Sequence, residues 1–236
     1  MDVVSGTAAH HPRTLWRRPR RRRTLAHVDA RPHEQPPRDR GWDVLLVGGA
    51  AGSGKSRLAR LLSRSYAIPL LEVRDIVTAL RALTAPQEHP ALHGLDSRLD
   101  VASLSPDDVV GIHLGVCAAV HDGLAAVIGD HISSRAPVVV EGDYLTPALA
   151  ALPTYAGVAA ERRVRSVFVE EPDVDQLVAN LLIREPQHGE QRDRAIVSAT
   201  FGRWLAAQQA PDGVSFLPAR PWATLGARAM AVIDRG

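Results

Sequence analysis

The stretch Gly49-Ala50-Ala51-Gly52-Ser53-Gly54-Lys55-Ser56 matches the pattern G-x-x-x-x-G-K-[ST] at every fixed position. An apolar run over 43–47 precedes it, and residues 55–65 follow with apolar side chains at helical spacing. A strand, a glycine-rich turn and a helix are the context in which this pattern forms a loop that holds the phosphates of a nucleotide. The sequence therefore predicts a nucleoside triphosphate site at this loop.

Each residue type in the loop has a physical task. The glycines let the backbone turn through conformations that a side chain forbids, and they let amide groups approach an anion closely. The ammonium of Lys55 is expected to reach the β- and γ-phosphates, and the hydroxyl of Ser56 is expected to bind Mg²⁺. We therefore predict that ATP and Mg²⁺ are the cofactors, and that the nucleotide is held by Gly49, Gly52, Ser53, Gly54, Lys55, Ser56 and Arg57.

Apolar runs elsewhere in the chain indicate the rest of the fold. Such runs occur at 68–73, 138–141, 164–169 and 214–217, and stretches with helical periodicity separate them. Alternation of strands and helices is typical of a parallel sheet with right-handed crossover connections. The predicted fold class is α/β, with five parallel strands and helices on both faces of the sheet.

Carboxylates follow two of the predicted strands. The run 138–141 ends in Glu141, and Asp143 comes two residues later. An acid at the end of a buried strand resembles a Walker-B element, so we predict that Glu141, ahead of Asp143, acts on Mg²⁺ directly or through water. Asp75 follows the second predicted strand, where it would orient an attacking hydroxyl or accept its proton. An equal alternative for Asp75 is a charge in the first turn of a helix.

Arginines near the end of a further predicted helix indicate a lid. Arg184 ends that helix, and Arg192 and Arg194 follow a polar stretch. Arginines on a lid neutralise charge during phosphoryl transfer while the lid excludes water, so we predict that these three are catalytic and that the lid spans 184–203. The alternative is a solvated helical surface. The long polar connection 84–104 is predicted to bind the acceptor.

Charge divides the chain into a basic tail and a mildly acidic body. Of the 28 basic side chains, 27 are arginines, and the only lysine is Lys55. Residues 1–41 hold ten arginines and four acids, whereas 42–236 hold 18 basic and 22 acidic groups. We predict a disordered tail followed by one domain. An acidic body is not the surface expected of a nucleic-acid-binding protein, although the basic run 17–23 has a nucleic-acid or anionic-surface arm as its alternative interpretation.

Hydropathy and cysteine content favour a cytoplasmic protein without a membrane partner. No uninterrupted apolar run approaches the ~20 residues that cross a bilayer. A lone cysteine, Cys117, cannot form an internal disulfide, which suits a reducing compartment. Cys117 shares one helical face with His113 and His121. We interpret this as a packed helix face rather than a zinc site, because the sequence supplies no fourth ligand.

Several stretches together resemble the small-molecule kinases among the P-loop proteins, which are relatives of shikimate, gluconate and nucleoside-monophosphate kinases. The chain looks most like the actinobacterial 2-phosphoglycerate kinase-like proteins, and the resemblance covers about 43–234. The residues that carry it are the loop Gly49–Ser56, Glu72-Val73-Arg74-Asp75-Ile76-Val77, Val140-Glu141-Gly142-Asp143-Tyr144, the run 166–173 and Leu217-Pro218-Ala219-Arg220-Pro221-Trp222.

This resemblance implies an ATP- and Mg²⁺-dependent phosphotransferase that acts on a small-molecule acceptor such as 2-phosphoglycerate. It implies a three-layer P-loop NTPase fold with strand order 2-3-1-4-5, and it brings Arg220 near the adenine. One departure is Arg74, which stands where an acid is expected and leaves the acceptor role to Asp75. Two other functions share the same ATP machinery: an NTP-hydrolysing switch with the tail as its docking arm, and a toxin-like kinase of a nucleotide sugar.

Overall fold

The computed structural model describes residues 40–94, 103–208 and 213–235. The tail predicted to be disordered lies outside these residues except for its last two positions. Residues 95–102 of the predicted acceptor segment lie outside them as well. The fold below is that of the body, 39–236, which is a compact unit of its own.

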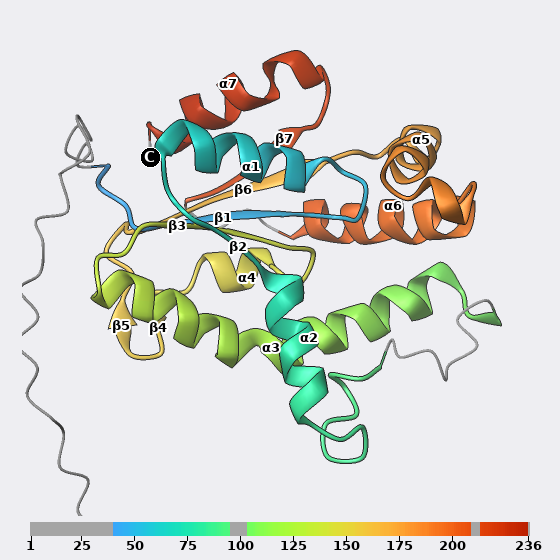
Figure 1. Cartoon of the computed structure of the whole chain (residues 1–236), viewed down its shortest axis with the longest axis horizontal. Coiled ribbons are helices and arrows are strands. Elements are labelled where there is room, and N and C mark those ends of the chain that lie inside the picture. The colour runs from blue at the N-terminus through green and yellow to red at the C-terminus, as the bar shows by residue number, and fades with distance from the viewer. Residues whose placement is uncertain (1–39, 95–102, 209–212, 236) are drawn as a thin grey trace, which may run out of the picture. The chain divides into compact units, whose positions relative to one another are not determined.

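A parallel five-stranded sheet forms the middle layer of the body (Figure 1). Its order is β2-β3-β1-β6-β7, which is the predicted order 2-3-1-4-5 once the five strands of this sheet are counted along the chain. The predicted α/β fold class and the predicted order are therefore confirmed. The strands are β1 (Val44–Gly49), β2 (Leu70–Glu72), β3 (Val138–Glu141), β6 (Val164–Glu170) and β7 (Val214–Pro218).

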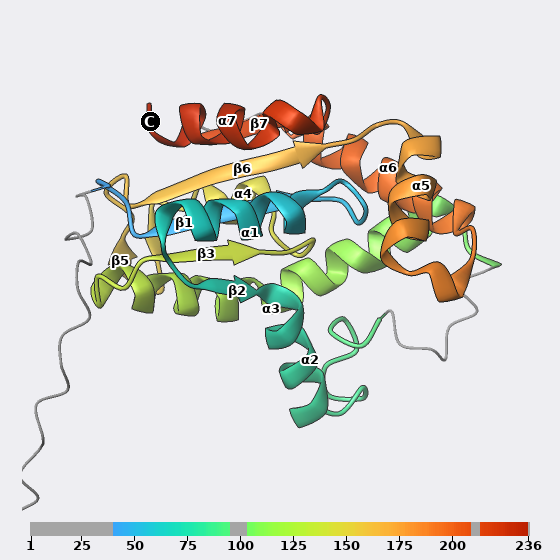
Figure 2. The same cartoon turned by 45° about the horizontal axis from the view of Figure 1, so that its top comes forward.

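The central strand β1 is apolar or glycine at all six positions because both of its faces are buried. Leu45 and Val47 belong to the core shared with α1 (Lys55–Tyr66) and α7 (Trp222–Ile233). Val44 and Leu46 belong to the core on the other face, which α3 (Pro106–Ser133) covers together with α2 (Val73–Leu83) and α4 (Pro147–Ala150). Figures 1 and 2 show α1 and α7 on one side of the sheet and α3 on the other.

The remaining helices lie beyond the carboxyl ends of the strands, on the side of the phosphate loop (Figure 2). They are α5 (Val174–Arg184), the short 3₁₀ turn η2 (Pro186–His188) and α6 (Arg192–Ala207), and α6 packs against both α5 and α3. The sequence did not predict the hairpin of β4 (Thr154–Tyr155) and β5 (Val158–Ala159). Strands this short carry too little periodicity to be recognised.

Helix α3 begins with a capping box. Ser105 caps it, since the Asp108 amide donates to the Ser105 hydroxyl at 3.2 Å and the Ser105 amide donates back to the Asp108 carboxylate at 3.3 Å. Within the described part of the chain, α3 is also the one helix long and apolar enough to cross a membrane, with 28 residues and a mean hydropathy of 1.5. His113, His121 and Asp122 interrupt its apolar residues, so the expectation that no uninterrupted apolar run approaches this length is not contradicted. One side of α3 packs into the core, so length and composition alone are weak evidence for a span.

Two glycines of α3 make a matched pair for testing this packing. A methyl group at Gly129 would overlap the carbonyl oxygen of Tyr155 in the hairpin, whereas one at Gly123 would meet no atom within 4 Å. We expect Gly129→Ala to lower the free energy of unfolding by about 1–3 kcal/mol, because the hairpin must move. Gly123→Ala should raise it by about 0.5–1 kcal/mol through lower chain entropy. Urea unfolding measures both changes, and equal shifts would contradict the close packing of α3 on the hairpin.

Candidate functional site

The predicted phosphate loop connects β1 to α1 at the carboxyl edge of the sheet. Gly49, Gly52 and Gly54 have φ values of +137°, +80° and +93°, which side chains rarely adopt. Space is equally restrictive, since a methyl group at Gly49 would come within 2.6 Å of the Val169 carbonyl oxygen and one at Gly54 would overlap the ring of Trp222. The loop geometry therefore requires glycine at these positions for conformational and steric reasons together.

Lys55, Ser56 and Glu141 meet beside this loop. The Ser56 hydroxyl donates a hydrogen bond to Oε1 of Glu141 at 3.0 Å, and Nζ of Lys55 lies 3.8 Å from the same oxygen. Lys55 and Glu141 are both buried. Burial raises the pKa of Glu141, and the Lys55 charge and the Ser56 hydrogen bond oppose that shift. The predicted metal pair and the predicted phosphate lysine thus occupy one small polar site.

The loop residues fit a bound nucleotide phosphate. Ser53 is 1% exposed, and its hydroxyl oxygen has no hydrogen-bond partner among the described residues. A buried polar group of this kind normally has a hydrogen-bond partner, and an anion in the loop would supply one.

Ser56 and Glu141 are the residues that would hold Mg²⁺, and the described chain has no cluster of three or more metal-ligating side chains. Mg²⁺ usually takes one or two protein groups and completes its shell with phosphates and water.

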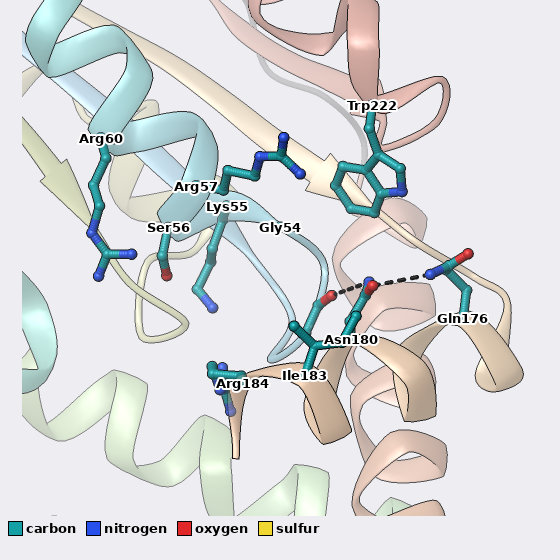
Figure 3. Close-up of a pocket in the computed structure, with 11 residues that line it drawn as sticks. Gly54, Lys55, Ser56, Arg57, Arg60, Gln176, Asn180, Ile183, Arg184 and Trp222 are labelled. Carbon is teal, nitrogen blue, oxygen red and sulfur yellow. Dashed lines mark hydrogen bonds between the residues drawn. The ribbon is translucent and has the colours of Figure 1, made fainter. Parts of the chain in front are cut away.

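A cavity of about 440 Å³ opens over the loop (Figure 3). Asn180 on α5 supports the loop by donating to the Gly52 carbonyl at 2.9 Å, and Gln176 donates to Asn180 at 3.0 Å. In Figure 3, Arg57 extends toward Trp222 at the mouth of this cavity. Its lining residues are Gly52, Gly54, Lys55, Ser56, Arg57, Arg60, Gln176, Asn180, Ile183, Arg184 and Trp222. The cavity therefore offers basic groups and an aromatic ring, both beside the loop.

A second cavity of about 180 Å³ lies next to the loop, between α3 and α6. Asp143, His113 and Arg194 line it, together with Ala51 of the loop. Burial by itself would raise the pKa of Asp143, but Lys55 and His113 outweigh it, and the pKa of Asp143 is lowered. A carboxylate that stays ionised thus faces this cavity beside the phosphate loop.

The three predicted lid arginines have different surroundings. Arg184 lines the larger cavity and Arg194 the smaller one, and both pair with Glu185, at 2.8 Å and 2.6 Å respectively. Burial would raise the pKa of Glu185, but hydrogen bonds and charge from these arginines outweigh it and lower that pKa. Arg192 instead pairs with Asp175 at 3.0 Å on an exposed surface and lines neither cavity. Its predicted catalytic role stays a prediction.

Asp75 lies in the first turn of α2, because that helix begins at Val73 and shortens the predicted second strand. Its side chain is exposed and lines neither of the two cavities at the phosphate loop. The carboxylate at the strand end is Glu72, which pairs with Arg60 at 3.3 Å and with Arg74 at 3.6 Å. Arg74, the departure from the family pattern, thus neutralises an acid of its own chain.

Arg220, predicted to lie near the adenine, follows β7. Its guanidinium pairs with the buried carboxylate of Glu171 at 3.0 Å and with Asp173 at 3.3 Å. These bonds hold the turn before α7, whose first residue is Trp222. A role for Arg220 toward the nucleotide stays a prediction, and its visible contacts are with the protein.

Sequence reasoning did not identify the parts played by Asn180, Gln176 and His113. Asn180 and Gln176 are four residues apart on α5, and only the packing of that helix against the loop reveals their function. His113 had been interpreted as part of a packed helix face; its Nε2 lies 2.8 Å from the Asp143 carbonyl oxygen. Cys117 on the same helix is buried, and burial raises the pKa of its thiol to about 12.

No protein-family model and no curated protein matches the sequence. A gluconokinase from Sinorhizobium meliloti 1021 is similar in structure, with 19% identity, 82% of this chain and 92% of that chain covered, and a TM-score of 0.44. A sugar kinase from Janibacter sp. HTCC2649 shows 15% identity, coverage of 82% and 95%, and a TM-score of 0.48. A shikimate kinase from Acinetobacter baumannii in complex with shikimate shows 11% identity, coverage of 81% of this chain and 93% of that chain, and a TM-score of 0.43. Likeness at this level carries no conclusion about what this chain binds.

The contact between α5 and the phosphate loop gives a testable consequence. Asn180→Leu keeps the size of the side chain but removes the donor to the Gly52 carbonyl. We expect ATP affinity to fall about tenfold, because leaving a partly buried carbonyl without its partner costs about 1–3 kcal/mol. Gln176→Leu is the matched control on the same helix, and it should have a smaller effect because Gln176 reaches the loop only through Asn180. Calorimetric titration with ATP measures both, and unchanged affinity in Asn180→Leu would show that the bond does not order the loop.

Proposed function

We propose that this protein is a cytoplasmic, ATP-dependent phosphotransferase that moves the γ-phosphoryl group of ATP to a small-molecule acceptor. The observation that carries the proposal is the meeting of Lys55, Ser56 and Glu141 at a glycine loop, with a second, charged cavity beside it. A nucleotide site alone supports binding or hydrolysis. The adjoining cavity supports transfer, because it offers room for an acceptor next to the phosphates.

We assign nucleotide binding to the cavity of about 440 Å³ over the phosphate loop. Backbone amides of the loop and the N-terminal end of α1 bind the phosphates, and Lys55 supplies a compact positive charge. Mg²⁺ held by Ser56 and Glu141 would neutralise phosphate charge during transfer. Arg184 faces the same cavity and stabilises charge on the transferring group. Trp222 lines the same cavity beside Gly54, and its flat ring can stack with a nucleobase.

We assign acceptor binding to the cavity of about 180 Å³ between α3 and α6. We assign the carboxylate that orients the attacking hydroxyl to Asp143 rather than to Asp75, because Asp143 lines this cavity and Asp75 is exposed on α2. Arg194 and His113 give the cavity positive and polar groups that suit an anionic acceptor. Among such acceptors we propose a phosphorylated acid such as 2-phosphoglycerate, the class to which the sequence resemblance points.

Glu185 supports a lid function for this region. It pairs with Arg184 at one cavity and with Arg194 at the other, so the turn between α5 and α6 carries one acid between two arginines. An incoming phosphate competes with Glu185 for both guanidinium groups. We propose that nucleotide and acceptor draw the arginines inward, and that this turn closes over them.

A pair of variants tests the assignment of the acceptor carboxylate. Asp143→Asn should lower acceptor-dependent phosphoryl transfer about 100-fold or more, the usual contribution of a positioned acid–base group. Its affinity for ATP should stay within about threefold of the wild type, because Ser56, Lys55 and Glu141 are retained. Asp75→Asn is the control, and it should leave turnover nearly unchanged. A large loss in Asp75→Asn with none in Asp143→Asn would reverse the assignment.

The reaction class is tested by ATP turnover in the presence of phosphorylated acids, sugars, nucleosides and nucleotide sugars. We expect ADP formation to depend on an acceptor, and 2-phosphoglycerate to give the highest kcat/KM. Lys55→Ala should abolish turnover with every acceptor, which excludes a contaminating kinase. Turnover that is independent of every acceptor would instead identify an NTP-hydrolysing switch, and selective turnover with a nucleotide sugar would identify the toxin-like activity.

A further inference from the structure

A third cavity, of about 550 Å³, lies at the other end of the sheet from the phosphate loop. Strand β7 begins at Val214, which pairs with Ser166, so Val164 and Arg165 at the start of β6 have no partner on that side among the described strands. Val164, Arg165 and Ser166 line the cavity. In Figures 1 and 2 the start of β6 and the C-terminal end of α7 lie together, away from the phosphate loop.

Three arginines from three segments line this cavity: Arg162 before β6, Arg165 within β6, and Arg235 after α7. None of the described lining residues is an acid. The rest of the wall is mainly small or apolar, with side chains from the α4 region, β6 and α7. Such a cluster stands out because the body as a whole carries more acids than bases.

Within the described part of the chain, the side-chain hydrogen bonds of Arg165 and Arg235 go to backbone carbonyls and not to acids. Nη1 of Arg165 donates to the Arg162 carbonyl at 2.8 Å, and its buried Nε has no hydrogen-bond partner. Nε of Arg235 donates to the Ala231 carbonyl at 2.6 Å. Their neighbour Arg163 differs, because it pairs with the buried carboxylate of Asp43. Burial and then the nearby charge of Arg162 lower the pKa of Arg165, as expected where like charges gather.

We propose that this cavity is an anion-binding site for a small molecule with two or more carboxylate or phosphate groups. Guanidinium groups bind such oxygens in a bidentate way, and three of them from separate segments can hold a polyanion that no single arginine retains. The apolar part of the wall accepts a short carbon backbone. The site is separate from the phosphate loop, so its ligand is neither the nucleotide nor the acceptor.

The test uses the full chain saturated with ADP and Mg²⁺, so that the phosphate loop is filled. Calorimetric titration with tricarballylate and with inorganic phosphate reports the carboxylate and phosphate forms of the ligand, and propane-1,2,3-tricarboxamide is the neutral control. We expect saturable binding of at least one anion and none of the amide. Arg165→Gln should weaken that binding about tenfold or more, as expected for a lost charged hydrogen bond.

Two further variants keep the proposal falsifiable if Arg165→Gln unfolds. Arg235→Gln, at an exposed helix end, should weaken anion binding to a similar extent, whereas Arg64→Gln removes an exposed charge elsewhere and should not. Equal losses in all three variants would show general charge attraction and overturn the site.

Asp212 lies outside the described residues and is the acid next to Gly213 of the cavity wall. A wild type that binds neither anion, with an Asp212→Asn variant that binds one, would show that the chain supplies its own counter-ion and would likewise overturn the proposal.

Discussion

The register between β1 and β3 is the constraint on which the candidate site depends. Val47 pairs with Glu141, and the Gly142 amide donates to the Val47 carbonyl at 3.2 Å. This pairing sets the end of β3 beside the loop that follows β1, so a carboxylate far along the chain reaches the loop's lysine and serine. A slip of one residue would turn Glu141 to the other face of the sheet. Gly142 keeps the contact close, since a methyl group there would come within 2.7 Å of Val73.

Buried charge at this edge of the sheet is tolerated because it is paired. Glu141 has Lys55 and Ser56, and Glu171, the residue after β6, has Arg220. Removing either cation would leave a carboxylate uncompensated in a place that water hardly reaches, which is costly. The same low exposure strengthens every electrostatic interaction with a bound phosphate. Stability and the proposed phosphate binding therefore depend on the same few groups.

The use of lysine at a single position also follows from this geometry. An ammonium is compact and fits between the loop carbonyl of Ala50 and the Glu141 carboxylate, at 3.4 Å and 3.8 Å. A guanidinium is larger and planar, and it needs space for its fork of donors. Arginines use several contacts at once elsewhere: two nitrogens of Arg184 meet Oε1 of Glu185, and Nη1 of Arg194 meets Oε2 of Glu185 and Oε1 of Gln191. Composition alone shows only a preference for arginine, and the geometry beside the loop accounts for the exception at Lys55.

The sequence by itself determined the glycine loop between β1 and α1 and the carboxylate at the end of β3, because each depends on residues close together in the chain or on a pattern of fixed spacing. The strand order was implied by the family resemblance. Tertiary structure decided the rest. It placed Asp143 at the smaller cavity and left Asp75 on the outside of α2, and it joined Asn180 to the Gly52 carbonyl. These relations depend on how α5 and α6 pack against a loop more than a hundred residues away, which no local pattern records. Proximity across the fold is set by packing and register, so carboxylates with similar sequence signals come to lie in different surroundings.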